Sequence, residues 1–119
     1  PKYAKAWSNL GYTQNHQGNY DGAIQSFQKA IESDANYAAP WNGLAYAYNF
    51  KGKYYKALEC GQKALKIDPK YANAWNNIGY AYAKLGRYSQ SLAAYKKAAE
   101  LDPQNETYKQ NLAAAKKRL

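Results

Sequence analysis

Few side chains in this sequence could act as a nucleophile, a general base or a metal ligand. The chain of 119 residues has one histidine, His16, and one cysteine, Cys60. Two residues cannot supply the four ligands of a structural zinc site, and a single cysteine excludes an internal disulfide framework. No pattern indicates a catalytic triad or a glycine-rich phosphate loop. We therefore expect no catalytic residues, no metal, no cofactor and no enzymatic activity.

Both residues have a simpler structural interpretation. His16 comes two residues before Gly18, near the end of a predicted helix, where a solvated cation suits the helix dipole. Cys60 precedes Gly61 within another predicted helix, and free cysteines are often buried. We expect His16 to be exposed and Cys60 to be a small packing residue.

Aromatic side chains dominate the composition. The chain has 14 tyrosines and 3 tryptophans, and 46% of its residues are hydrophobic, although the mean hydropathy is −0.85. Such aromatic content argues against disorder, and the length suits about one domain. No apolar run approaches the roughly 20 residues of a membrane span, and no signal peptide is recognisable. We expect a cytoplasmic protein.

The aromatic residues recur at a fixed interval. Residues 1–7 and 69–75 agree at six of seven positions, an offset of 68, which is twice 34. At the offset of 34, seven positions hold one residue type in three copies: Tyr3, Tyr37 and Tyr71; Trp7, Trp41 and Trp75; Tyr12, Tyr46 and Tyr80; Gly18, Gly52 and Gly86; Tyr20, Tyr54 and Tyr88; Ala30, Ala64 and Ala98; Asp34, Asp68 and Asp102. This period predicts stacked structural repeats.

Each unit is predicted to form two helices. In the first unit, Trp7 and Leu10 follow helical spacing and are expected to face the core, and Gly18 ends this helix. The second helix starts near Asp21 and ends near Asp34. Its apolar stripe contains Ala23, Ile24, Phe27, Ala30 and Ile31. The pattern predicts an all-α fold.

The period, the paired helices and the residue pattern resemble the tetratricopeptide repeat. The resemblance covers residues 1 to 105. It rests on Trp7, Leu10, Gly11, Ala23, Phe27 and Ala30; on Trp41, Leu44, Ala45, Tyr48, Ala57, Ala64 and Pro69; and on Trp75, Ile78, Gly79, Tyr82, Ser91, Tyr95, Ala98 and Pro103. It implies a right-handed α-solenoid of three repeats, about 4–37, 38–71 and 72–105, in a single domain of residues 1–119.

Three residues depart from the family pattern. Gln14 replaces a usual tyrosine, Ala35 a usual proline, and Gly61 a usual large aromatic residue. Gly61 is expected to leave a hole and to cost about 1 kcal/mol of helix propensity against alanine. The middle unit would then be the softest, unless Phe50 or Tyr55 fills the space.

The two ends of the sequence differ. Residues 105 to about 118 are predicted to form an amphipathic capping helix, which a solenoid needs over its last repeat. Pro1 aligns with Pro69 and Pro103, so we expect a chain cut from a longer array or built as a repeat module.

The resemblance implies that the first helices line a concave groove that holds partner peptides. In this groove we expect a protein or peptide segment, possibly acidic in character, to contact Lys5, Asn9, Tyr12, Asn42, Tyr46, Asn49, Phe50, Asn76, Asn77, Tyr80 and Lys84. Tyrosines would supply apolar area, asparagines would bond the ligand backbone, and the lysines would favour acidic residues at the groove ends. Alternatively, the tyrosines only pack between repeats. Gly43 either leaves room for a bulky partner residue or marks a close helix contact.

Some family members grip an acidic C-terminus with lysine, arginine and asparagine at set groove positions. The matching positions here hold Ser8, Tyr12, Gly43, Asn73 and Asn77, none of them basic. We therefore expect no such carboxylate clamp.

Charge is distributed unevenly along the chain. Residues 1–48 carry no net charge, whereas residues 49–119 hold 14 basic and 5 acidic residues, net +9. An alternative function is therefore binding of an acidic partner or of nucleic acid by this basic half, although no RNA-binding motif is present and no specific nucleic acid is expected. A third possibility is self-association through the N-terminal repeat face.

Overall fold

The computed structural model describes residues 2–119, so Pro1 and its predicted inter-repeat turn lie outside the described residues. The described chain consists of seven α-helices: α1 (Lys2–His16), α2 (Tyr20–Ser33), α3 (Ala38–Phe50), α4 (Tyr54–Ile67), α5 (Ala72–Lys84), α6 (Tyr88–Leu101) and α7 (Glu106–Lys117). The predicted all-α solenoid with a capping helix is confirmed.

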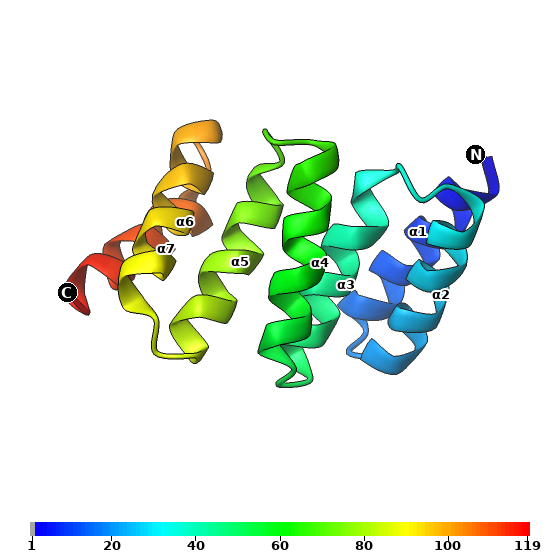
Figure 1. The fold of residues 1–119 in the computed structure, drawn as a ribbon, viewed down its shortest axis with the longest axis horizontal. Helices are drawn as coiled ribbons and strands as arrows, with labels where there is room; N and C mark the ends of the chain where they lie inside the picture. Colours follow the sequence, from blue (N-terminus) through cyan, green and yellow to red (C-terminus); the bar gives the residue numbers. More distant parts are fainter. Residues whose placement is uncertain (1) are drawn as a thin grey trace.

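The helices stack as three antiparallel pairs, α1 with α2, α3 with α4 and α5 with α6, and α7 packs against α6. Each second helix also contacts the first helix of the next pair, so that α2 packs against α3 and α4 against α5. The result is an elongated molecule of 42 × 25 × 22 Å, whose two termini lie at opposite ends of the long axis (Figure 1).

Glycine ends each first helix within the three pairs. Gly18, Gly52 and Gly86 have φ values of 79°, 77° and 76°, which lie in the left-handed region that other residues rarely adopt. The amide N–H of Gly18 donates to the carbonyl oxygen of Asn15, and Gly52 and Gly86 repeat this contact one and two units later. The predicted stop at Gly18 is confirmed.

The recurring tryptophans tie the first helices to the turns between repeats. Trp41 donates its indole Nε1–H to the carbonyl oxygen of Ala35 at 3.1 Å, and Trp75 makes the same bond to Pro69 at 3.1 Å. Each tryptophan therefore combines partial burial with a satisfied polar group. The bond to Ala35 also shows that this turn forms without the usual proline.

Phe27 fills the space between the first two pairs. Its ring is fully buried and lies against the backbones of Gly11 and Gly43, where an added Cβ at Gly43 would come within 2.1 Å of the ring. Gly43 is therefore a close helix contact and leaves no room there for a partner residue.

The hole predicted at Gly61 is absent. A Cβ added to Gly61 would lie 2.7 Å from Cγ1 of Ile78, so the side chain of Ile78 occupies the space that an aromatic ring would take. Phe50 and Tyr55 do not fill it, since both side chains are exposed.

Leu10 departs from its predicted place in the core. It is 43% exposed, whereas Leu44 and Ile78 at the same position of α3 and α5 are each 3% exposed. The reason is geometric: α2 packs against α3 and α4 packs against α5, but no helix among the described residues precedes α1.

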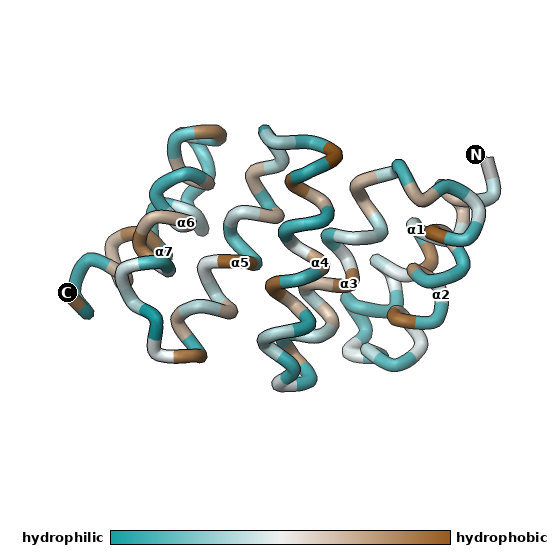
Figure 2. Tube along the Cα trace, in the orientation of Figure 1, coloured by the Kyte–Doolittle hydropathy of each residue, from teal (hydrophilic) through white to brown (hydrophobic). Residues whose placement is uncertain are grey.

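Hydropathy along the trace is mixed, with short hydrophobic stretches separated by longer hydrophilic ones (Figure 2). The core is accordingly built from buried alanines and partly buried rings, such as Trp41, Tyr48 and Trp75. Within residues 2–119, no helix combines the length and apolar character that crossing a membrane requires.

Candidate functional site

The first helices of the pairs form the inner side of the curved stack. α1 contacts α3 and α3 contacts α5, whereas the second helices contact one another far less. The stack therefore bends toward the first helices, and α2, α4 and α6 form the outer side, which faces the viewer in Figure 1. This concave face is where the candidate binding residues of α1, α3 and α5 lie.

Three asparagines bond to one another beneath this face. Asn77 donates Nδ2–H to Oδ1 of Asn42 at 2.8 Å, and Asn42 donates to Oδ1 of Asn73 at 3.1 Å. Asn42 and Asn77 are buried. We call Asn42, Asn73 and Asn77 the asparagine cluster. It joins α3 to α5 through a buried bond between Asn77 and Asn42, and Asn73 forms its exposed edge.

Further amides extend this network along the stack. Asn15 donates to the carbonyl oxygen of Gly43 at 3.1 Å, and Asn49 donates to that of Asn77 at 3.0 Å, so the same bond recurs between successive first helices. Toward the capping helix, Asn73 donates to the hydroxyl of Tyr108 at 3.1 Å. The Nδ2–H groups of Asn15 and Asn49 thus pair helix with helix, whereas their Oδ1 atoms are buried without a hydrogen-bond partner among the described residues.

Tyr12 belongs to this internal network. Its hydroxyl donates to the carbonyl oxygen of Ala39 at 2.6 Å and accepts from Asn42 at 3.1 Å. Its ring meets the edge of Phe27 at 5.0 Å between centroids. Burial, together with the neighbouring Tyr71, raises the pKa of the Tyr12 hydroxyl well above its usual value. Tyr12 is therefore a packing residue that links α1 to α3.

The accessible part of the concave face is aromatic. The rings of Tyr46 and Phe50 lie 4.6 Å apart between centroids, and Phe50 stacks against Tyr20 and Tyr80 at 5.6 Å each. Phe50 is 47% exposed, and the three tyrosines are half-buried. We call Tyr20, Tyr46, Phe50 and Tyr80 the aromatic cluster. Its flat apolar surface offers contact area at a low cost in side-chain entropy.

Four other predicted residues with polar side chains are exposed or half-buried. Lys84 ends α5 and lies over the ring of Tyr80, with Nζ 5.4 Å from its centroid. Lys5 and Asn9 of α1 are exposed, and half-buried Asn76 of α5 accepts a bond from Asn111 at 2.9 Å. These four residues can still reach a ligand on the concave face.

The predicted site residues thus separate into three groups, of which exposed Lys5 and Asn9 and half-buried Asn76 form one. The structure brings Tyr46, Phe50, Tyr80 and Lys84 together at the surface. It places four others in contacts between helices: Tyr12, Asn42, Asn49 and Asn77. The sequence missed Tyr20, which belongs to α2; its recurrence as Tyr54 and Tyr88 was the available signal.

The positions of a carboxylate clamp carry no cation. Ser8 is buried, Gly43 packs against Phe27, and the hydroxyl of Tyr12 is engaged by Ala39 and Asn42. The remaining positions belong to the asparagine cluster. These positions therefore offer no cation to an acidic C-terminus.

The two residues considered for chemistry occupy the predicted environments. Cys60 is buried, and burial raises the pKa of its thiol to about 12, which disfavours the reactive thiolate. His16 is exposed at the end of α1. Over the described part of the chain, no group of three or more histidine, cysteine, aspartate or glutamate residues is placed to hold a metal ion.

Protein-family models match most of the chain. One model, described as tetratricopeptide repeat, matches residues 4–37 and 72–105. Two more, described as TPR repeat and tetratricopeptide repeat, match residues 50–86 and 26–59. The four ranges together run without a gap from residue 4 to residue 105.

Similarity to individual proteins is of two kinds. A curated relative, the heat-shock protein cognate co-chaperone sgt12 of Aspergillus fumigatus, is 44% identical over 36 residues, which are 30% of this chain and 11% of the relative's length. The first TPR of Spaghetti (RPAP3), bound to the HSP90 peptide SRMEEVD, gives a TM-score of 0.91 at 23% identity over 98% of this chain and 93% of that chain.

Two further solved structures share the fold. The second TPR domain of human RPAP3, in complex with the HSP70 peptide SGPTIEEVD, has a TM-score of 0.86 at 24% identity over 97% of this chain and 96% of that one. The Sgt2 TPR domain from Aspergillus fumigatus has a TM-score of 0.90 at 25% identity, over 97% of this chain and 78% of that chain.

Proposed function

Because the chain belongs to the tetratricopeptide repeat family, we propose that it is a protein-interaction scaffold that binds a peptide segment of a partner on the concave face of α1, α3 and α5. The observation that carries this proposal is the aromatic cluster. Its central ring, Phe50, stacks against Tyr20 and Tyr80 and remains 47% exposed. Two solved structures of similar fold are bound to HSP90 and HSP70 peptides, which supports peptide binding by a domain of this fold.

The accessible residues define how a segment would be held. Tyr46, Phe50 and Tyr80 supply the apolar contact, since aromatic anchors carry much of the energy at interfaces. Asn9 and Asn76 provide amide groups for a ligand backbone. Lys5 and Lys84 stand at the two ends of the face and favour acidic residues there.

A selection from a random peptide display library on the purified chain tests this proposal. The counter-screen uses the triple variant Tyr46→Ala, Phe50→Ala and Tyr80→Ala, which omits buried Tyr12 so that the fold is preserved. Each single truncation is expected to cost about 1–2 kcal/mol, or about 5- to 30-fold in Kd. Tyr55→Ala is the matched control, because this ring is 63% exposed on α4, outside the aromatic cluster.

Enriched peptides with a shared motif that is lost on the triple variant would support groove binding. Acidic peptides without a motif, held equally by the triple variant and released by salt, would contradict it and favour the basic half of the chain instead. Thermal unfolding of every variant separates lost binding from lost folding.

A further inference from the structure

A hollow of about 390 Å³ lies at one end of the concave face, between α5, α6 and the capping helix α7. Tyr80 and Tyr95 form part of its wall, and Ala114 of α7 lies opposite. Ala114 stands 34 residues after Tyr80 and 68 after Tyr46, at the same position of the repeat. The capping helix therefore lacks the ring that the two preceding first helices carry at this position, which leaves space.

Two cations line this hollow. Lys84 and Arg118 occupy one repeat position, 34 residues apart, where α3 carries Phe50. Lys84 lies over the ring of Tyr80 at 5.4 Å, and the guanidinium of Arg118 lies over the ring of Tyr88 at 5.1 Å. Contact with a ring orients a cation but leaves its positive charge uncompensated by any anion.

No acidic side chain neutralises these two charges. The residues around the hollow include no aspartate or glutamate. The salt bridges among residues 2–119 join Lys51 to Asp21 and Lys109 to Glu106, and neither lies at the hollow. The local potential is therefore positive, as charge-complementary recognition of an anion requires.

Neutral donors accompany the cations. The Tyr95 hydroxyl has no hydrogen-bond partner within the described residues, and burial raises its pKa to about 12, so it keeps its proton at neutral pH. The amide of Asn111, on α7, donates one of its hydrogens to Asn76 at 2.9 Å and retains a second. Together with Lys84 and Arg118, these groups place several hydrogen-bond donors beside an aromatic wall.

We propose that this hollow is a carboxylate-binding subsite, in which Lys84 and Arg118 bind an acidic side chain or a chain terminus of the segment held on the aromatic cluster. The inference rests on the proposed function, because it adds a second contact point to the same ligand. It places the anion at the capping-helix end of the face, on residues that do not include any of the clamp positions. Phe50, Tyr80 and Lys84 connect the aromatic cluster to the hollow.

Nitrogen-15 NMR titration of the whole chain with three small probes tests the subsite. The probes are acetyl-Phe-Glu-amide, its neutral counterpart acetyl-Phe-Gln-amide, and acetyl-Phe-Gly with a free terminal carboxylate. The two carboxylate probes are expected to shift the Arg118 Nε–H signal and the backbone signals of Lys84 and Tyr95, whereas the neutral probe leaves these signals in place. Whichever carboxylate probe binds more tightly assigns the source of the carboxylate.

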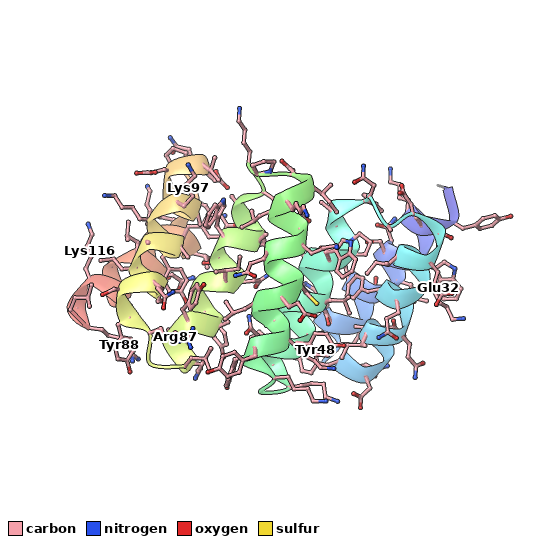
Figure 3. All side chains as sticks on the ribbon, in the orientation of Figure 1. Glu32, Tyr48, Arg87, Tyr88, Lys97 and Lys116 are labelled. Atoms are coloured by element: carbon pink, nitrogen blue, oxygen red, sulfur yellow. The ribbon has the colours of Figure 1, made fainter. Side chains whose placement is uncertain are left out.

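The double variant Lys84→Gln and Arg118→Gln is expected to weaken both carboxylate probes about tenfold, the usual range for charged hydrogen bonds. The matched control is Lys97→Gln with Lys116→Gln, which removes two exposed cations from α6 and α7 outside the hollow (Figure 3). It is expected to change affinity by less than about twofold.

Equal binding of the glutamate and glutamine probes, or an unaltered affinity in the Lys84 and Arg118 variant, would overturn the subsite. So would the absence of any shift with both carboxylate probes. Shifts at Tyr46 and Phe50 with all three probes, without any carboxylate-dependent shift at Arg118, would show that the groove binds and that only the subsite fails. Carboxylate shifts at Arg118 without any at Tyr46 and Phe50 would instead count against the proposed function.

Discussion

The side-chain amide of Asn77 donates to Oδ1 of Asn42 across 2.8 Å, and so joins α5 to α3 beneath the concave face. Both side chains are buried, with exposures of 6% and 2%. A buried polar pair of this kind holds two helices in one register, because any slip would leave both amides without partners. The concave face therefore rests on an internal polar layer, and its ligand-accessible surface lies above that layer.

Loss of this pair is expected to destabilise the fold. Asn77→Ala leaves Oδ1 of Asn42 buried without its donor, and such a loss costs about 1–3 kcal/mol. Urea unfolding measures this change in the free energy of unfolding. Asn9→Ala is the matched control, since Asn9 occupies the same repeat position on the exposed surface of α1 and should change stability by less than about 0.5 kcal/mol. Equal effects of the two substitutions would contradict the internal role of Asn77.

The contact between Gly43 and Phe27 predicts that adding one methyl group at Gly43 destabilises the fold. Gly43→Ala should gain about 1 kcal/mol in helix propensity, but its Cβ would come within 2.1 Å of a fully buried ring. We expect the clash to prevail and the variant to lose about 1–3 kcal/mol of stability. In chemical denaturation, Phe27→Leu should rescue part of this loss in the double variant. A Gly43→Ala protein more stable than the parent would refute the close contact.

Leu10 and Leu44 occupy the same position of the repeat but differ in burial. We therefore expect substitution by alanine to destabilise the fold by different amounts at the two positions. Leu44→Ala opens a cavity in the core and is expected to cost about 2–5 kcal/mol. Leu10→Ala removes a side chain that is 43% exposed and should cost less than about 1 kcal/mol. Thermal unfolding reports the difference, because 1 kcal/mol corresponds to about 4 °C for a domain of this size. A melting temperature that falls as far for Leu10→Ala as for Leu44→Ala would place Leu10 in the core.

Because the Cys60 thiol is buried, we expect it to react slowly with alkylating reagents. We also expect the free energy of unfolding to fall as the pH becomes alkaline. Its thiol pKa rises from 9.0 to about 12 on folding. Between these values the unfolded chain loses the proton first, so stability is retained below pH 9 and declines as pH rises toward 12. At pH 8, iodoacetamide should modify the folded chain at least about 100-fold more slowly than the urea-unfolded chain.

The Cys60→Ala variant isolates the contribution of this thiol to the alkaline decline. Buried Tyr12 and Tyr95 also have raised pKa values, so part of the decline remains in the variant. The decline in the variant should nevertheless be smaller than in the parent. Identical pH profiles, or rapid alkylation of the folded chain, would show that the thiol is accessible.

Much of the architecture could be predicted from the sequence because it depends on local and periodic features. A residue with a positive φ is needed where each first helix ends, and glycine recurs there at Gly18, Gly52 and Gly86. The repeated tryptophans and alanines mark faces that pack against neighbouring helices at every period. These features repeat along the chain, so three copies confirm one another.

The candidate site was only partly predictable. Helical spacing predicts Tyr46, Phe50, Tyr80 and the asparagines on one side of their helices, but spacing alone does not say how close the next helix comes. The structure shows that α1, α3 and α5 approach one another closely enough for Asn42, Asn77 and Tyr12 to bond across the gap. Tyr46 and Phe50 contact Tyr20 of α2 and remain partly accessible, whereas Asn49, which lies between them in the sequence, is buried.

The sequence by itself determined the period, the helix pairs, their glycine stops and the absence of basic residues at the clamp positions, since each follows from residue type and position along one chain. Only the tertiary structure decided which amides are buried, that Ile78 fills the space at Gly61, that Leu10 is uncovered, and that Lys84 and Arg118 share a hollow. Those properties depend on distances between residues that are far apart in the chain. Such distances are set by the packing of whole helices and not by any local pattern.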